Sequence, residues 1–118
     1  MTPTAPAPTY RLERGALGTD KIPIILNIDA EPDGLFIDRE RPLPWRGYER
    51  SAEYLQRLRS RIASVTGSPA HFTWLVRLDP QIAETYGSAE WPLMRYGDRL
   101  SADEAIGDEL GVHIHPYR

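Results

Sequence analysis

The sequence predicts an α/β domain in which parallel strands are joined by crossover helices. Short apolar segments rich in β-branched residues alternate along the chain with segments whose apolar residues recur every three or four positions. The first pattern is typical of strands covered on both faces, and the second of amphipathic helices. Because helices separate the strands, we expect right-handed crossovers within one parallel sheet.

Length and composition indicate one globular domain and exclude several kinds of site. The 118 residues are 41% hydrophobic and 26% charged, and the net charge of −3 gives no basic footprint for nucleic acid. The chain has no cysteine, so any metal site must use histidine and carboxylate ligands. Because no apolar segment approaches the roughly 20 residues that span a bilayer, and no signal peptide is recognisable, we expect a cytoplasmic protein without a membrane partner.

Three strands are expected in chain order. Residues 22–28 form a β-branched segment without polar alternation, residues 71–76 form a second such segment, and residues 110–115 alternate in polarity. Residues 1–20, rich in proline and alanine, are expected to be a flexible tail, and residues 21–118 the folded domain.

Three helices are expected between these strands. Apolar residues of 48–67 repeat at helical spacing. Asp79 followed by proline predicts a helix over 79–87, and a capping-box pattern that begins at Ser101 predicts a short helix over 101–107.

A long connection, residues 30–47, follows the end of the first predicted strand. Loops of this length are commonly functional or disordered, and sites in parallel α/β folds lie at the carboxyl ends of strands. Within it, Trp45 can stack on a sugar ring or simply pack, and Arg46 can hold an anionic group. Both are therefore candidate substrate-binding residues.

Carboxylates and histidines gather at two predicted strand ends. Asp29, Glu31 and Asp33 alternate as the first strand ends, and alternate residues of an extended chain point the same way. His113 and His115 have the same spacing in the last strand and can grip one ion. A solvated acidic turn and two ordinary histidines are the alternatives for each motif taken alone. Together the motifs predict a divalent-metal site, with Zn²⁺ expected and Co²⁺ or Ni²⁺ possible.

These motifs also resemble a known family. The sequence Asn-Ile-Asp-Ala-Glu-Pro-Asp at 27–33, the Phe-Thr-Trp-Leu segment at 72–75 and the sequence Gly-Asp-Glu-Leu-Gly-Val-His-Ile-His-Pro at 107–116 look like the amino-terminal portion of the polysaccharide deacetylase (NodB-homology) superfamily. The likeness implies a partial (β/α) barrel of the glycoside hydrolase and deacetylase type. It also implies a metal-dependent hydrolase acting on a C–N bond, with a carbohydrate or small amide as substrate.

The resemblance assigns roles to individual residues. By position, Asp29 resembles the family's catalytic base and His113 its first histidine ligand. The family's second aspartate is replaced by Ala30, and the histidine expected four residues after His113 is replaced by Tyr117. Variant members with Asp-x-Glu and His-x-His motifs suggest that Glu31 and His115 act as the replacement ligands.

Such a barrel needs about 200 residues, so we expect this chain to represent the family's amino-terminal half. The three-stranded sheet would then have open edges, which self-association can cover. A noncatalytic remnant, or a small module that binds carbohydrate or metal without turnover, is the alternative reading.

Overall fold

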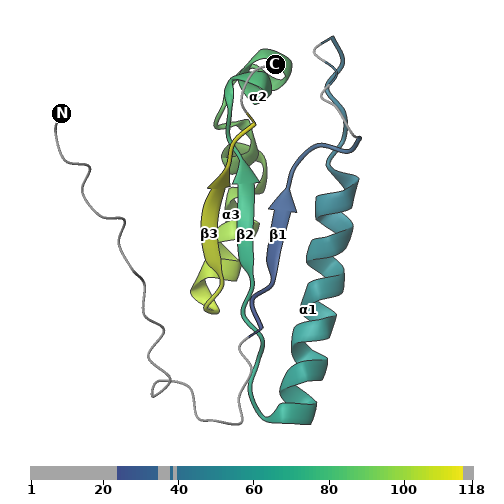
Figure 1. Cartoon of the computed structure of the whole chain (residues 1–118), viewed down its shortest axis with the longest axis vertical. Coiled ribbons are helices and arrows are strands. Elements are labelled where there is room, and N and C mark those ends of the chain that lie inside the picture. The colour runs from purple at the N-terminus through teal and green to yellow at the C-terminus, as the bar shows by residue number, and fades with distance from the viewer. Residues whose placement is uncertain (1–23, 35–37, 39, 116–118) are drawn as a thin grey trace, which may run out of the picture.

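A computed structural model describes residues 24–34, 38 and 40–115 of the chain (Figure 1). The three strands form one parallel sheet in the order β1-β2-β3, which confirms the predicted α/β class. The predicted tail, residues 1–20, lies outside the described residues. In chain order the elements are β1 (Asn27–Ala30), α1 (Arg46–Thr66), β2 (Thr73–Arg77), α2 (Pro80–Tyr86), α3 (Trp91–Ala105) and β3 (Glu109–His113).

The strands are shorter than, or shifted from, the predicted segments. β1 begins at Asn27, opposite Thr73 of β2, and the apolar residues 24–26 before it are exposed and outside the strand. β3 ends at His113, opposite Arg77, two residues before the predicted end. Strand length here follows the partner's hydrogen-bonding ladder rather than the local run of apolar residues.

The third helix was predicted wrongly at its start. α3 begins at Trp91, with a proline in its first turn, so that Ser101 lies inside the helix and is exposed. A Ser-x-x-Glu sequence matches a capping box but also occurs within helices, where the backbone donors are already bonded. α3 ends at Ala105, two residues before the end of the predicted range. Gly107, the predicted stop, follows with φ of 104°, and the ring of His71 occupies the space of a Cβ there.

The start of α2 and the ends of α1 and α2 follow their sequence signals. Asp79 caps α2 by accepting a hydrogen bond from the Ile82 amide at 3.1 Å. Gly67 and Gly87 end α1 and α2 in the left-handed conformation, with φ of 78° and 89°. None of the helices in the described ranges is long and apolar enough to cross a lipid bilayer.

The long helices pack together on one face of the sheet. Tyr48 of α1 meets Trp74 of β2 edge to face at 5.7 Å and Tyr96 of α3 at 4.8 Å. Val76 belongs to the same buried cluster, and Figure 1 shows α1 beside β1 with α3 behind the strands. Because residues of a strand alternate between faces, Leu75 and its neighbours in register lie on the opposite face.

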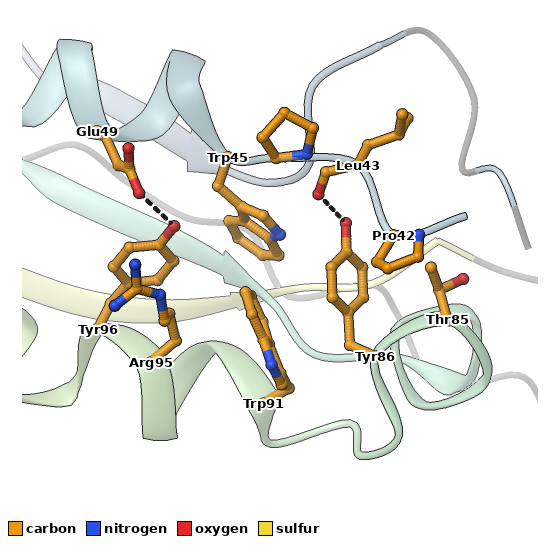
Figure 2. Close-up of a pocket in the computed structure, with 10 residues that line it drawn as sticks. Pro42, Leu43, Trp45, Glu49, Thr85, Tyr86, Trp91, Arg95 and Tyr96 are labelled. Atoms are coloured by element: carbon orange, nitrogen blue, oxygen red, sulfur yellow. Dashed lines mark hydrogen bonds between the residues drawn. The ribbon is translucent and has the colours of Figure 1, made fainter.

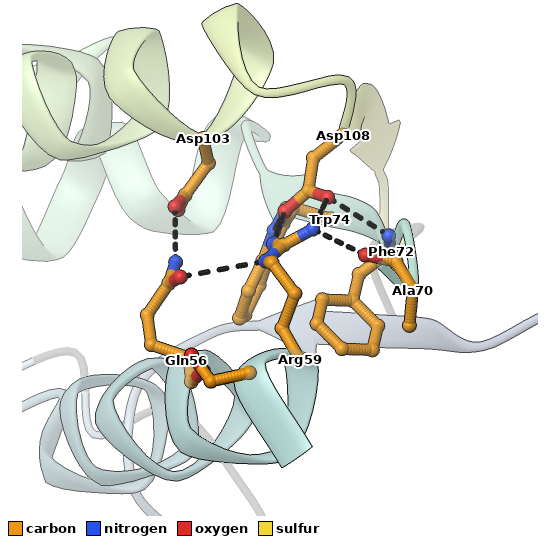
Figure 3. Close-up of polar contacts among 8 residues, drawn as sticks. Gln56, Arg59, Ala70, Phe72, Trp74, Asp103 and Asp108 are labelled. Atoms are coloured by element: carbon orange, nitrogen blue, oxygen red, sulfur yellow. Dashed lines mark hydrogen bonds and ion pairs between the residues drawn. The ribbon is translucent and has the colours of Figure 1, made fainter. Parts of the chain in front are cut away.

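A buried ion pair fixes the start of β3 against α1 and β2 (Figure 3). The Asp108 carboxylate accepts two hydrogen bonds from the Arg59 guanidinium, at 2.8 and 2.6 Å. It accepts two more, from the Phe72 amide at 3.0 Å and from Trp74 Nε1 at 2.9 Å. Burial alone raises the pKa of Asp108, but these hydrogen bonds outweigh it and hold that pKa below its ordinary value.

Of the two buried aspartates in this region, Asp103 has the less favourable environment for a charged carboxylate. Its Oδ1 accepts a hydrogen bond from Gln56 Nε2 at 2.7 Å, whereas its buried Oδ2 has no hydrogen-bond partner among the described residues. Burial, followed by repulsion from Asp108, raises the pKa of Asp103 above its ordinary value. Its ionised form is therefore destabilising in the fold.

Asp103→Asn is expected to raise the free energy of unfolding at pH 7. Because the pKa of Asp103 is raised in the fold, the native protein binds more protons than the unfolded chain once the pH exceeds the unfolded pKa of about 3.9. Stability is thus lost as the pH rises through this window, and asparagine removes that loss. Urea unfolding at pH 4 and pH 7 measures the difference between variant and wild type, which should be larger at pH 7. A difference between variant and wild type that is equal at the two pH values, or larger at pH 4, would contradict this account. The same would follow if Asp98→Asn, at an exposed position, had the same effect.

Candidate metal centre

The structure brings together the three residues predicted as metal ligands. Glu31, His113 and His115 each offer one ligand atom, and these atoms all lie within 4.8 Å of one another. Glu31 directly follows β1, whereas the histidines belong to β3 and the residues after it. The chain therefore has a Glu/His/His group that could hold a metal ion at the carboxyl edge of its sheet.

The parallel register explains why these side chains meet. Asp29 pairs with Leu75 of β2, and His113 pairs with Arg77 of the same strand. Because Leu75 and Arg77 are two residues apart, Asp29 and His113 lie on the same face of the sheet, opposite the helices. After β3 ends, the His115 amide donates a hydrogen bond to Asp79 Oδ2 at 3.1 Å. This bond holds His115 at the sheet edge, where the strand ladder no longer does.

Each histidine contacts one carboxylate of the first strand segment. His113 Nδ1 lies 3.1 Å from Asp29 Oδ1, and His115 Nε2 lies 3.5 Å from Glu31 Oε2. The two imidazole rings stack, with centroids 4.6 Å apart and planes inclined by 22°. The predicted base and the predicted ligands thus form one connected cluster.

The Glu31 carboxylate has the capacity to accept a cation. Its Oε2 is buried and accepts no hydrogen bond from the described residues, which is costly for a carboxylate oxygen. Ligands at 2.0–2.2 Å from a tetrahedral zinc ion lie about 3.3–3.6 Å from one another. The 3.5 Å between Glu31 Oε2 and His115 Nε2 falls within this range.

Arg77 is a site residue that the sequence analysis missed. The side chain is buried, its Nε donates to Asp79 Oδ2 at 2.7 Å and its Nη2 donates to Gln81 at 2.6 Å. Nη1 lies 3.7 Å from Glu31 Oε2. An arginine that ends an otherwise apolar strand was the available signal, since buried arginine is rare unless paired.

The pairing with Arg77 also sets the charge of Asp79. Burial by itself raises the pKa of this carboxyl, but hydrogen bonds from Arg77 and from the backbone amides of His115 and Ile82 lower it, and the net shift is downward. Asp79 therefore stays ionised and balances the Arg77 guanidinium. Glu31 is left with only the longer contact to that cation.

A pocket of about 690 Å³ opens beside Asp29 and Glu31. Arg46, predicted to bind substrate, lines it with an exposed side chain, but its Nε already contacts Asp33 Oδ2 at 3.1 Å. Arg50 also lines the pocket and has no ion-pair partner in the described part of the chain. The anion that Arg46 holds in the structure is therefore one of the protein's own carboxylates, and its role in substrate binding stays a prediction.

Trp45 lies in the buried core rather than beside the predicted metal ligands, and Figure 2 shows it among aromatic side chains. Its side chain is 2% exposed and is surrounded by Tyr86, Trp91 and Tyr96, with ring centroids 5.8–6.1 Å away. It lines a separate pocket of about 380 Å³. A ring so covered has no free face for a sugar, so the geometry favours packing, the alternative left open by the sequence, over substrate binding.

Comparisons with known proteins add no relative: no family model, characterised protein or solved structure matches this chain.

Asp33 caps α1 from outside the helix. Trp45, the N-cap residue, makes no side-chain cap, and Asp33 Oδ1 instead accepts a hydrogen bond from the Gly47 amide at 2.8 Å. Burial raises the pKa of Asp33, but the hydrogen bonds from Gly47 and Arg46 outweigh it, and the pKa is lowered. The cap joins the end of the β1 segment to α1 and so shapes one wall of the pocket.

Asp33→Ala is expected to lower the free energy of unfolding by about 1 kcal/mol, the usual effect of removing a helix cap. Asp33→Asn keeps an acceptor for Gly47 and should lose less. Because the folded pKa of Asp33 is lowered, the wild-type advantage should shrink as the pH falls below the unfolded pKa and through the folded one. Urea unfolding of the three proteins at pH 7 and pH 3 measures this, and an alanine variant as stable as wild type at pH 7 would disprove the capping role.

Proposed function

We propose that this protein is a metal-dependent hydrolase that cleaves an amide C–N bond and that it deacetylates a carbohydrate. The observation that carries the proposal is the Glu31, His113 and His115 group, with the Asp29 carboxylate beside it. The same residues carry the resemblance to polysaccharide deacetylases. Geometry and motif thus support the same chemistry.

The ligand set suits a borderline divalent cation. Two imidazole nitrogens and one carboxylate oxygen are typical of catalytic zinc sites, in which a fourth position stays open, and Co²⁺ or Ni²⁺ can use the same donors. A bound dication of this kind polarises a scissile carbonyl and lowers the pKa of a bound water. The pocket lined by Asp29 and Glu31 offers space for an acylated sugar next to the carboxylate member of this group.

Asp29 is the residue proposed to accept the proton of the attacking water. Its side chain is half exposed and lines the pocket, so that solvent and substrate can both reach it. Oδ1 contacts His113, whereas Oδ2 accepts no hydrogen bond from the described residues. A carboxylate in this position can act as a general base.

The sheet topology supports a barrel-like origin. The strand order follows the chain order, and α1 and α3 both pack on the face that bears Trp74. Successive β-α units of a (β/α) barrel are arranged in this way, with the site at the carboxyl ends of the strands. A doubly wound fold would instead place helices on both faces.

The full chain is expected to bind one equivalent of Co²⁺ or Zn²⁺. Titration with Co²⁺, followed by its visible absorption, should give a saturable signal that Zn²⁺ displaces. His113→Ala and Glu31→Gln should each weaken binding at least tenfold, because each removes a ligand. His71→Ala is the matched control, since His71 is an exposed histidine outside the group. The proposal is abandoned if the wild-type chain binds none of Zn²⁺, Co²⁺ and Ni²⁺, or if His113→Ala binds as wild type does.

Metal-loaded protein is expected to release acetate from oligomers of an N-acetylated amino sugar. Asp29→Asn should lower the rate by about 10²–10⁴-fold, the usual contribution of a general base, and removal of the metal by a chelator should abolish turnover. Acetate and free amine are measured together, so that release of both in equal amounts identifies amide cleavage. Saturable metal binding without turnover on such oligomers or on simple amides would support the noncatalytic binding module instead.

A further inference from the structure

We infer that Asp29 is also a positioning residue, which holds the His113 ring so that its Nε2 faces the metal. This inference rests on the proposed function and deepens it. It gives the Asp29 carboxylate a role before any substrate is bound. The contact between Asp29 Oδ1 and His113 Nδ1, at 3.1 Å, is the observation that carries it.

The contact selects one form of the imidazole. A neutral histidine carries its proton on one nitrogen and a lone pair on the other, and a carboxylate can only accept. Next to Asp29, the proton therefore resides on Nδ1, and Nε2 keeps the lone pair that a cation requires. Histidine ligands of metals commonly have such a carboxylate partner, which fixes both the form and the orientation of the ring.

The fold makes this contact across an intervening strand. Asp29 lies on β1 and His113 on β3, so the two backbones are about 9.5 Å apart, twice the spacing of neighbouring strands. Between them, β2 presents Leu75, whose Cδ2 lies only 2.8 Å from where a Cβ of Gly111 would be. Because Gly111 has no side chain, Leu75 can lean toward β3. The contact between Asp29 and His113 can then be made above the Leu75 side chain.

The same contact orients the second histidine. The ring of His115 stacks on that of His113, with centroids 4.6 Å apart, and its Nε2 faces Glu31. His115 is also fixed through its backbone, by the hydrogen bond to Asp79. A His113 ring released by loss of the Asp29 contact would therefore disturb both imidazole ligands.

Two substitutions separate positioning from general-base catalysis. Asp29→Asn keeps an oxygen that can accept the Nδ1 proton of His113, but an amide cannot take a proton from water. Asp29→Ala removes both functions. Since the Asp29 side chain is half exposed, neither change creates a buried cavity. Asp98→Ala is the matched control, because Asp98 is an exposed aspartate on α3.

Zn²⁺ affinity of the full chain, measured by calorimetry without substrate, tests the inference. Asp29→Ala should weaken binding about 10–100-fold, the usual effect of removing such a partner, whereas Asp29→Asn should stay within a few-fold of wild type and Asp98→Ala should match it. In ¹⁵N NMR of the metal-free proteins, the ring nitrogens of His113 should report a proton on Nδ1 in wild type and Asp29→Asn. Asp29→Ala should show a mixture of the two forms.

The outcomes distinguish this inference from the proposed function. If wild type binds Zn²⁺ and Asp29→Ala binds it equally well, the positioning role is overturned while the proposed hydrolase survives. If Asp29→Asn weakens binding as much as Asp29→Ala does, the negative charge of Asp29 rather than its acceptor oxygen is responsible, and the inference fails. If wild type binds no metal, the proposed function fails. The His113 nitrogen shifts then still decide whether Asp29 holds the ring.

Discussion

The buried carboxylate of Asp108 is the interaction on which the rest of the structure depends. It receives hydrogen bonds from α1 through Arg59 and from the start of β2, and it lies directly before β3. The next residue, Glu109, donates its amide to the Phe72 carbonyl at 2.9 Å, which begins the β2–β3 ladder. Since that ladder is continuous, the register set at this end places His113 beside Arg77 at the other end. A polar network remote from the cluster therefore determines where the histidines lie.

At the opposite edge of the sheet, Asp79 has a comparable role. One carboxylate caps α2, pairs with Arg77 and accepts the amide of His115. Because Asp79 compensates the Arg77 guanidinium, that cation can remain near Glu31 without a full pairing, and the Glu31 oxygen keeps capacity for another positive charge. The two aspartates together hold the ligand segments from both ends of β2 and β3.

The sequence predicted the composition of the cluster better than it predicted the elements that support it. Period-two spacing placed Asp29 with Glu31 and His113 with His115, and parallel strands must bring their carboxyl ends to one edge. The start of α3 was predicted wrongly, because Ser101 satisfies a local capping pattern that tertiary packing overrides. The environment of Trp45 depends on three aromatic rings from α2 and α3, and such long-range contacts leave no periodic signal in the chain. The pairing of Arg77 with Asp79 was missed for the same reason.

The division of the sheet into a packed face and a ligand face has a thermodynamic consequence. The aromatic core lies with α1 and α3 on one side, whereas the Glu/His/His group occupies the carboxyl edge and the other side. Small zinc domains without such a core are unfolded without their metal, and their binding energy is folding energy. Here the apolar core contains none of the three residues of that group, so the fold would not depend on an ion bound there. An ion held by the group would add stability that grows with the logarithm of its free concentration, and its exchange would not require the domain to be rebuilt.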